Sequence, residues 1–213
     1  MTPDAESARR MRLILELRQI GVTDARVLAA LERTNRSSFA PAHMEALAWD
    51  DLALPIACGQ TLTKPSLIAR FVRDLGVTPA DNVLEIGAGS GYQTAILARL
   101  GARVSSVERH EALAVSAQEA LSAIGVTNAA VHWADGADGW ATQAPYDRVI
   151  VNAAAPDFLP VVLNQMATGA VLLAPIGETE QRLMRVRKQD DGGFKVEDLG
   201  PVRLGQLEIG VAS

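Results

Sequence analysis

The glycine-rich run from Val83 to Tyr92, VLEIGAGSGY, limits the folds open to this chain more than any other feature. A short apolar segment typical of a buried strand leads into the alternate glycines Gly87, Gly89 and Gly91, and then into a helical pattern. Glycine at such a turn tolerates positive φ angles and lets the backbone pass close to a ligand. The run therefore predicts an α/β unit with a ligand at the strand end, although a purely structural turn can carry the same glycines.

Strand and helix patterns alternate around this run. We predict strands near 83–87, 103–108, 129–134, 147–153 and 170–176, with helices near 91–100, 110–123 and 157–167. Such alternation predicts a mostly parallel central sheet with helices on both faces. Beyond it, residues 182–187 alternate with period two, 190–193 form a turn signal, and 194–196 resume the alternation, which predicts an antiparallel hairpin at the C-terminal end of the sheet.

The N-terminal part has a different organisation. Residues 5–33 show the spacing of two helices, 39–64 lack a regular period but stay apolar, and Pro65 opens an amphipathic helix. We expect one domain over residues 1–213, with 1–75 as an N-terminal extension of helices and a long ordered loop. Loops of that length are often functional.

Composition excludes several classes of protein. Hydrophobic residues make up 48% and charged residues 21%, which is typical of a folded globular chain. The formal net charge of -5 argues against nucleic acid or anionic membrane surfaces as partners. No signal peptide or membrane span is recognised. Cys58 is the one cysteine, so neither an intrachain disulfide nor a multi-cysteine zinc site is expected. We expect a cytoplasmic protein without a metal.

Two acidic residues follow the predicted strands. Glu108 ends the second strand about twenty residues after the first glycine, where a carboxylate can accept hydrogen bonds from both ribose hydroxyls. Asp135 ends the third strand and precedes Gly136, a position from which it can receive an adenine amino group. A nicotinamide dinucleotide could use Glu108 in the same way, and Asp135 could instead cap a turn.

The spacing inside the glycine turn favours one cofactor. Gly87-x-Gly89-x-Gly91, with Glu85 inside the strand, differs from the G-x-G-x-x-G that accommodates a pyrophosphate. S-adenosylmethionine has no phosphate, but its amino acid end needs backbone donors and nearby carboxylates. The pattern therefore favours S-adenosylmethionine, with a dehydrogenase as the second hypothesis. Glu85 either belongs to this cofactor site or is a structural strand-end carboxylate bonded to backbone amides.

A second motif bears on the methyl acceptor. The stretch from Leu54 to Pro65, LPIACGQTLTKP, resembles the acceptor loop of the protein-L-isoaspartate O-methyltransferases. The similarity also covers 26–41 and 146–156, and it continues to about Arg203. The resemblance implies methylation of the free carboxylate of L-isoaspartyl residues in damaged proteins or peptides, with S-adenosylmethionine as donor and protein repair as the outcome. A carboxylate is already ionised at neutral pH, so such an acceptor needs no general base.

The resemblance also implies roles for residues of the loop. Thr63 stands where the family usually has Ser, and its hydroxyl would orient the acceptor carboxylate; alternatively it supports the start of the Pro65 helix. Gly59, Gln60 and Thr61 would belong to the substrate site. Asn152, where Thr or Gly is more frequent, would face the donor or acceptor, or bond locally.

The chain departs from the family after Pro201-Val202-Arg203, where it continues LGQLE. Because this segment helps to cover the acceptor in the family, methylation of another peptide or small-molecule carboxylate stays open. Thr63 in place of the family Ser leaves another hypothesis open, a non-catalytic protein that binds S-adenosylmethionine. We expect a monomer.

Overall fold

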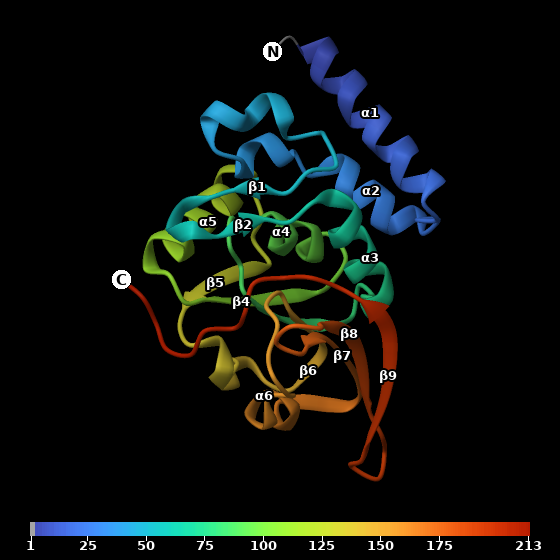
Figure 1. The fold of residues 1–213 in the computed structure, drawn as a ribbon, viewed down its shortest axis with the longest axis vertical. Coiled ribbons are helices and arrows are strands. Elements are labelled where there is room, and N and C mark those ends of the chain that lie inside the picture. The colour runs from blue at the N-terminus through green and yellow to red at the C-terminus, as the bar shows by residue number, and fades with distance from the viewer. Residues whose placement is uncertain (1–2) are drawn as a thin grey trace.

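The structure is a computed structural model that describes residues 3–213 (Figure 1). Its centre is a seven-stranded sheet with strand order β5-β4-β3-β6-β7-β8-β9. The strands are β3 (Asn82–Ile86), β4 (Arg103–Glu108), β5 (Ala129–Trp133), β6 (Tyr146–Val151), β7 (Met166–Ile176), β8 (Arg182–Lys188) and β9 (Phe194–Pro201). Strands β3 to β7 run parallel to one another, and β8 and β9 follow β7 in antiparallel pairing. The predicted fold class is confirmed.

Six α-helices accompany the sheet in the described residues: α1 (Pro3–Gln19), α2 (Ala25–Arg33), α3 (Pro65–Leu75), α4 (Tyr92–Ala98), α5 (Glu111–Ala123) and α6 (Pro160–Asn164). The helix expected over 157–167 is wrong in its length. Its last residues join β7 instead, because Met166 pairs with Tyr146 of β6, so β7 begins four residues before the predicted Ala170.

Alternation along the strands separates the two faces of the sheet. Val83 and Ile150 point into a large core that also contains buried residues of α1 to α5. Leu84 and Val149 point into a smaller core, where Val162 of α6 is buried. Because strand side chains alternate between faces, the odd positions of β3 face the N-terminal helices. The N-terminal segment and the sheet therefore share one core.

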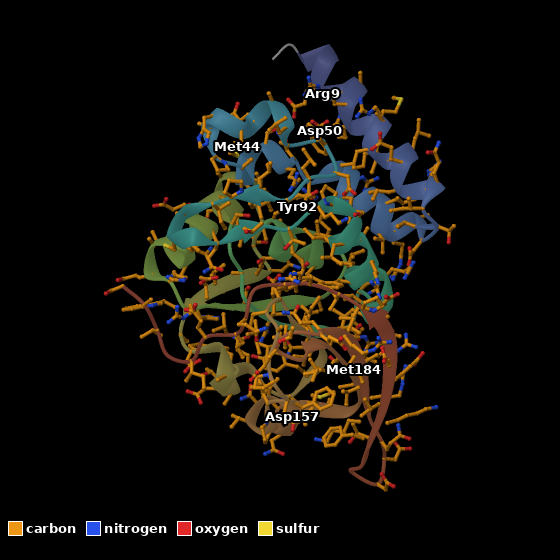
Figure 2. All side chains as sticks on the ribbon, in the orientation of Figure 1. Arg9, Met44, Asp50, Tyr92, Asp157 and Met184 are labelled. Carbon is orange, nitrogen blue, oxygen red and sulfur yellow. The ribbon has the colours of Figure 1, made fainter. Side chains whose placement is uncertain are left out.

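The segment predicted to be irregular contains short elements. Three 3₁₀ turns span Arg36–Phe39, Ala42–Leu47 and Ala57–Gly59, and the two-residue strands β1 (Leu54–Pro55) and β2 (Thr61–Leu62) pair antiparallel. Tyr92, at the start of α4, lies where this segment meets the sheet (Figure 2), with its ring centroid 5.7 Å from that of Phe39. The segment is thus packed onto the end of the glycine-rich turn.

The C-terminal tail crosses the carboxyl ends of the parallel strands, as the red coil in Figure 1 shows. Backbone hydrogen bonds attach it to the chain after β6, where Leu207 N donates to Ala154 O at 2.7 Å, and after β4, where Ala212 N donates to Arg109 O at 2.7 Å. In the described part of the chain, none of the helices has the length and apolarity needed to cross a membrane.

Candidate active site

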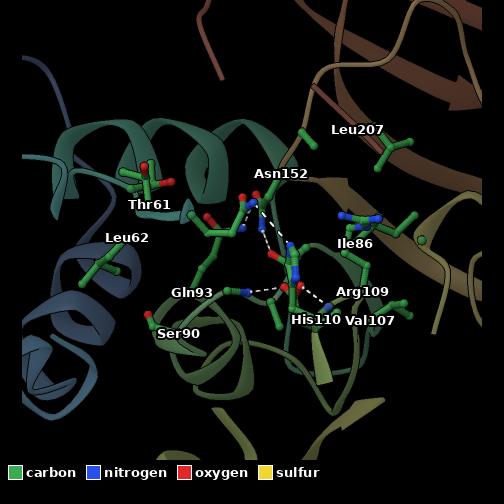
Figure 3. Close-up of a pocket in the computed structure, with 18 of the residues that line it drawn as sticks. Thr61, Leu62, Ile86, Ser90, Gln93, Val107, Arg109, His110, Asn152 and Leu207 are labelled. Carbon is green, nitrogen blue, oxygen red and sulfur yellow. Dashed lines mark hydrogen bonds between the residues drawn. The ribbon is translucent and has the colours of Figure 1, made fainter. Parts of the chain in front are cut away.

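A cavity opens at the carboxyl ends of β3, β4 and β6 (Figure 3), with about 840 Å³ of space including its part open to solvent. At this edge the strand order reverses: the chain runs outward from β3 to β4 and β5, and then crosses back to β6 on the other side of β3. Ligands of open α/β sheets bind at such switch points. The predicted residues that line the cavity are Gly87, Gly89, Glu108, Gly136, Gln60, Thr61, Thr63 and Asn152.

The glycine turn needs glycine for measurable reasons. Gly87, Gly89 and Gly91 have φ angles of +89°, +55° and +85°, a region that disfavours other residues. A Cβ on Gly87 would lie 3.3 Å from the Cβ of Asn152, and one on Gly91 would lie 3.1 Å from the Cβ of Ala117. Because Gly87 and Gly89 have no side chain, they leave the cavity space beside the backbone open. Gly91 lets α4 approach α5, and its contact with a cofactor stays a prediction.

Glu108 is locked in place at the end of β4. Its Oε2 accepts from Gly89 N at 2.8 Å and its Oε1 accepts from His110 N at 2.9 Å, while the residue is 5% exposed. A carboxylate offers about four acceptor sites, so each oxygen keeps one for a ligand. The geometry suits an acceptor of two hydroxyl groups.

Glu85 lies behind the turn and does not line the cavity. It is fully buried, and it accepts from Thr94 Oγ1 at 2.5 Å, Ser106 Oγ at 2.8 Å and Asn152 Nδ2 at 3.0 Å. Burial raises the pKa of Glu85 to about 7, although these hydrogen bonds oppose the shift. The alternative of a structural carboxylate matches this geometry, but the expected backbone amides are wrong as partners, because side chains of Thr94, Ser106 and Asn152 donate instead.

Asp135 holds backbone on two sides. Its Oδ1 accepts from Ala137 N at 2.9 Å and its Oδ2 accepts from Gly210 N at 2.6 Å. It therefore caps a turn, as the alternative had it, and also anchors the C-terminal tail. The next residue, Gly136, lines the cavity, and a Cβ there would lie 2.5 Å from Ile86 Cγ2. A direct contact between Asp135 and adenine stays a prediction.

A second cavity adjoins the first on the side of the acceptor loop, and Gly59, Lys64 and Arg203 line it. The two cavities share one wall, built from Gln60, Thr61, Thr63, Asn152, Ala153 and Gln206. Thr63 is half-buried in that wall, two residues before the start of α3. Three of the four residues predicted for the substrate, and Thr63, thus stand between two spaces.

Asn152 follows β6 and is held by three hydrogen bonds. Its Nδ2 donates to Glu85 Oε1 and to Gly87 O, both at 3.0 Å, and its Oδ1 accepts from Gln93 Nε2 at 2.9 Å. Figure 3 shows the Gln93 and Asn152 side chains reaching toward each other at the cavity. These bonds fix which way the amide points, so local bonding and a place in the shared wall go together.

Several lining residues were not predicted. His110 lines the first cavity, with its Nε2 3.5 Å from Gln60 Nε2. Its position two residues after Glu108 was the available signal. Gln206, Leu207 and Glu208 of the tail also line this cavity. No motif marked them, because their place depends on how the tail folds back.

The chemistry offered by the site is that of orientation. It presents backbone groups of a glycine turn, one locked carboxylate, a hydroxyl and an amide, and among residues 3–213 no cluster of three or more His, Cys, Asp or Glu could hold a metal. The open space beside Gly87 fits the amino acid part of an adenosyl amino acid, and the spare acceptor sites of Glu108 fit its ribose.

Comparisons with known proteins agree on one family. The family model for protein-L-isoaspartate (D-aspartate) O-methyltransferase matches residues 8–207. Proteins called protein-L-isoaspartate O-methyltransferase are 42% identical in Cereibacter sphaeroides, over 100% of both chains, and 44% identical in Caulobacter vibrioides, over 99% of this chain and 96% of that protein.

Solved structures show the same fold. A protein-L-isoaspartate O-methyltransferase superposes with a TM-score of 0.84 at 24% identity, covering 94% of this chain and 67% of that one. A putative member from Plasmodium falciparum, in complex with S-adenosyl-L-homocysteine, gives 0.82 at 19% identity, covering 92% and 97%.

Proposed function

The chain belongs to the protein-L-isoaspartate (D-aspartate) O-methyltransferase family, and we propose that it methylates the free carboxylate of L-isoaspartyl residues in damaged proteins or peptides. S-adenosylmethionine supplies the electrophilic methyl group. The enzyme is thus a methyltransferase of protein repair.

The observation that supports this function best is the wall shared by the two cavities. A methyl donor and a peptide carboxylate must approach from separate sides and meet at one point. Thr63 and Asn152 stand at such a point, with the donor cavity on one side and the acceptor cavity on the other. Holding two reactants in this way supplies much of the acceleration in a displacement reaction.

On the donor side, Glu108 accepts hydrogen bonds from the ribose hydroxyls of S-adenosylmethionine, and the backbone of Gly87 and Gly89 borders the amino acid end of the cofactor. Glu85 acts from beneath, because it fixes the amide of Asn152. Asp135 shapes the adenine end through Gly136 and the tail. These roles are supported by which residues line the donor cavity and by the hydrogen bonds that hold their side chains.

On the acceptor side, the Thr63 hydroxyl donates to the substrate carboxylate and orients it, while Gly59, Gln60 and Thr61 border the peptide. The carboxylate is ionised at neutral pH, so no proton has to be removed by the enzyme. The tail limits the entry of water above the donor cavity. Exclusion of water favours a reaction in which opposite charges are neutralised.

The protein's setting is a separate proposal. The net charge of -5 argues against nucleic acid as a partner, and the single cysteine suits a reducing compartment such as the cytoplasm. We propose a monomer, and sedimentation velocity over a range of concentrations tests it.

The decisive experiment supplies methyl-labelled donor and a pair of peptides that differ only in an isoaspartyl or an aspartyl linkage. We expect base-labile label in the isoaspartyl peptide alone. Equal labelling of both peptides would favour another carboxylate as acceptor. Absence of label despite binding of S-adenosylhomocysteine would favour a binding protein without turnover.

A further inference from the structure

Arg36 is a fully buried arginine next to the acceptor loop. Its two terminal nitrogens donate to carbonyl oxygens of segments that are neither helix nor long strand. The bonds run from Nη1 to Ala48 O at 2.9 Å and Asp50 O at 3.4 Å, and from Nη2 to Leu52 O at 2.8 Å, Thr63 O at 3.1 Å and Leu62 O at 3.5 Å. One guanidinium thus gathers both ends of the loop that contains Thr63.

Burial of this charge is costly unless polar groups surround it. Among the described residues, no carboxylate lies within ion-pair distance of the guanidinium. Arginine cannot lose its proton in a protein, so the carbonyls must stabilise it. Conversely, carbonyls of an irregular segment need donors. The two terminal nitrogens of Arg36 and these carbonyls therefore satisfy each other, which holds the loop to one shape, whereas Nε is buried without a hydrogen-bond partner.

A second contact fixes the other side of Thr63. Asp51 Oδ1 accepts from Ser66 N at 2.7 Å, at the start of α3, where Lys64 makes no side-chain cap bond. The backbone around Thr63 is therefore held from behind at its own carbonyl by Arg36, and three residues later by Asp51. Both holding groups come from the segment before the loop.

Arg36 also contacts the donor side. Its Cζ lies 5.7 Å from the ring centre of Tyr92, the residue that directly follows Gly91 of the glycine turn. A guanidinium over an aromatic ring is attracted to it. The same side chain thus touches the acceptor loop and the first residue of the helix that begins at the donor turn.

From this juxtaposition we infer that Arg36 is a positioning residue, which sets the place of the Thr63 hydroxyl relative to the donor turn. It does not touch substrate or cofactor. The inference rests on the proposed function, because it takes Thr63 as the ligand of the acceptor carboxylate. Misplacement of such a group by about 1 Å can cost about 100-fold in rate.

The test compares Arg36→Lys with Arg26→Lys. Arg26 is a matched control, because it donates to a single carbonyl, Val77 O at 2.7 Å, outside the site. Lysine keeps the charge but cannot reproduce the planar fork. We expect kcat per S-adenosylhomocysteine-binding site to fall about 100-fold in Arg36→Lys with the Kd for S-adenosylhomocysteine within about 3-fold, and no such fall in Arg26→Lys.

A purely structural role predicts a different result. Activity would then fall only in proportion to the number of binding sites, with kcat per site unchanged, and that result would overturn the inference. Asp51→Ala is the second variant if Arg36→Lys does not fold. It removes the bond to Ser66 N, and we expect the same loss of kcat per site with cofactor affinity kept.

Hydrogen exchange gives a readout without turnover. We expect the backbone amides of Leu62, Thr63, Lys64 and Ser66 to exchange at least about 10-fold faster in Arg36→Lys than in the wild-type protein, with amides of β3 unchanged. Equal exchange rates of these amides in Arg36→Lys and in the wild-type protein would overturn the inference. If the wild type fails to label isoaspartyl peptide, the proposed function is wrong, and these exchange rates still decide whether Arg36 holds the loop.

Discussion

The donor and acceptor sides of the site each contain a fully buried ionisable side chain, Glu85 and Arg36. Glu85 is bonded by neutral groups of regular elements: Thr94 on α4, Ser106 on β4 and Asn152 just after β6. Arg36 is bonded by carbonyls of an irregular segment. The sheet would hold the donor side in place without its buried group, whereas the acceptor loop depends on its own.

The two groups also differ in how they meet the cost of burial. A carboxylate can take up a proton, and burial raises the pKa of Glu85 to about 7. A guanidinium keeps its charge, so Arg36 must keep its carbonyl partners. The donor side therefore tolerates neutralisation of its buried group, and the acceptor side does not. This difference predicts which changes affect cofactor affinity and which affect turnover.

The largest effect is expected on the acceptor side. Thr63→Val keeps the shape of the side chain and removes its hydroxyl, so kcat with isoaspartyl peptide should fall by about 10² to 10³ while the Kd for S-adenosylhomocysteine stays unchanged. Steady-state kinetics and calorimetry measure the two quantities. Thr127→Val, at an exposed and distant position, is the control. A parallel loss of cofactor affinity would blur the distinction between the two sides.

The next effect concerns the pH dependence of stability. The pKa of Glu85 is about 7 in the folded state against 4.5 ordinarily, so the folded state binds the proton more tightly than the unfolded state. Its contribution is full below about pH 4.5 and is lost as pH rises through 7, on the order of 3 kcal/mol. Denaturant unfolding at several pH values measures this slope.

Glu85→Gln should flatten that slope, whereas Glu119→Gln at an exposed position should keep it. An unchanged slope in Glu85→Gln would mean that Glu85 titrates normally. The donor side would then resemble the acceptor side, because Glu85 would keep its charge while buried, as Arg36 does.

A smaller effect is expected from Gly87→Ala. Its φ of +89° and the 3.3 Å approach to Asn152 Cβ should weaken S-adenosylhomocysteine binding about 10- to 30-fold, with less change in the KM for peptide. Gly192→Ala carries a similar strain at φ +83° with nothing within 4 Å, so it should lower stability alone. Equal affinities in the two variants would place the cofactor elsewhere.

The smallest effect tests Glu108. Glu108→Gln should raise the Kd for S-adenosylhomocysteine about 10-fold, since a hydrogen bond to a charged group is worth about 1.5–3 kcal/mol and the amide still accepts one bond. An analogue without ribose hydroxyls should bind the wild type and the variant equally. If the variant weakens the analogue as well, Glu108 acts on the fold of the turn and not on the ribose.

Much of the donor side was predictable because its signals are local. A glycine turn after an apolar strand, and a carboxylate at the next strand end, occupy short stretches whose geometry follows from strand and helix alternation. The same logic failed at 157–167, where apolar spacing fits both a helix and the start of β7. Pairing with Tyr146 decided between them, and pairing is not visible in one segment.

The acceptor side was predictable only through resemblance. The motif around Thr63 indicated a role, but not what holds it, since Arg36 and Asp51 lie 27 and 15 residues from their partners Thr63 and Ser66. The tail residues that line the donor cavity are farther still from the glycine turn. An exposed or buried position for Arg36 could not be read from its neighbours in sequence.

By itself, the sequence determined the α/β class, the donor turn and the family, because strand and helix periods, positive-φ glycines and motifs are properties of contiguous residues. Only the tertiary structure decided that Glu85 lies beneath the cavity, that Asp135 holds the tail, and that Thr63 stands in a wall between two spaces. These depend on buried polar groups, whose partners come from distant segments and are selected by the cost of leaving any of them unbonded.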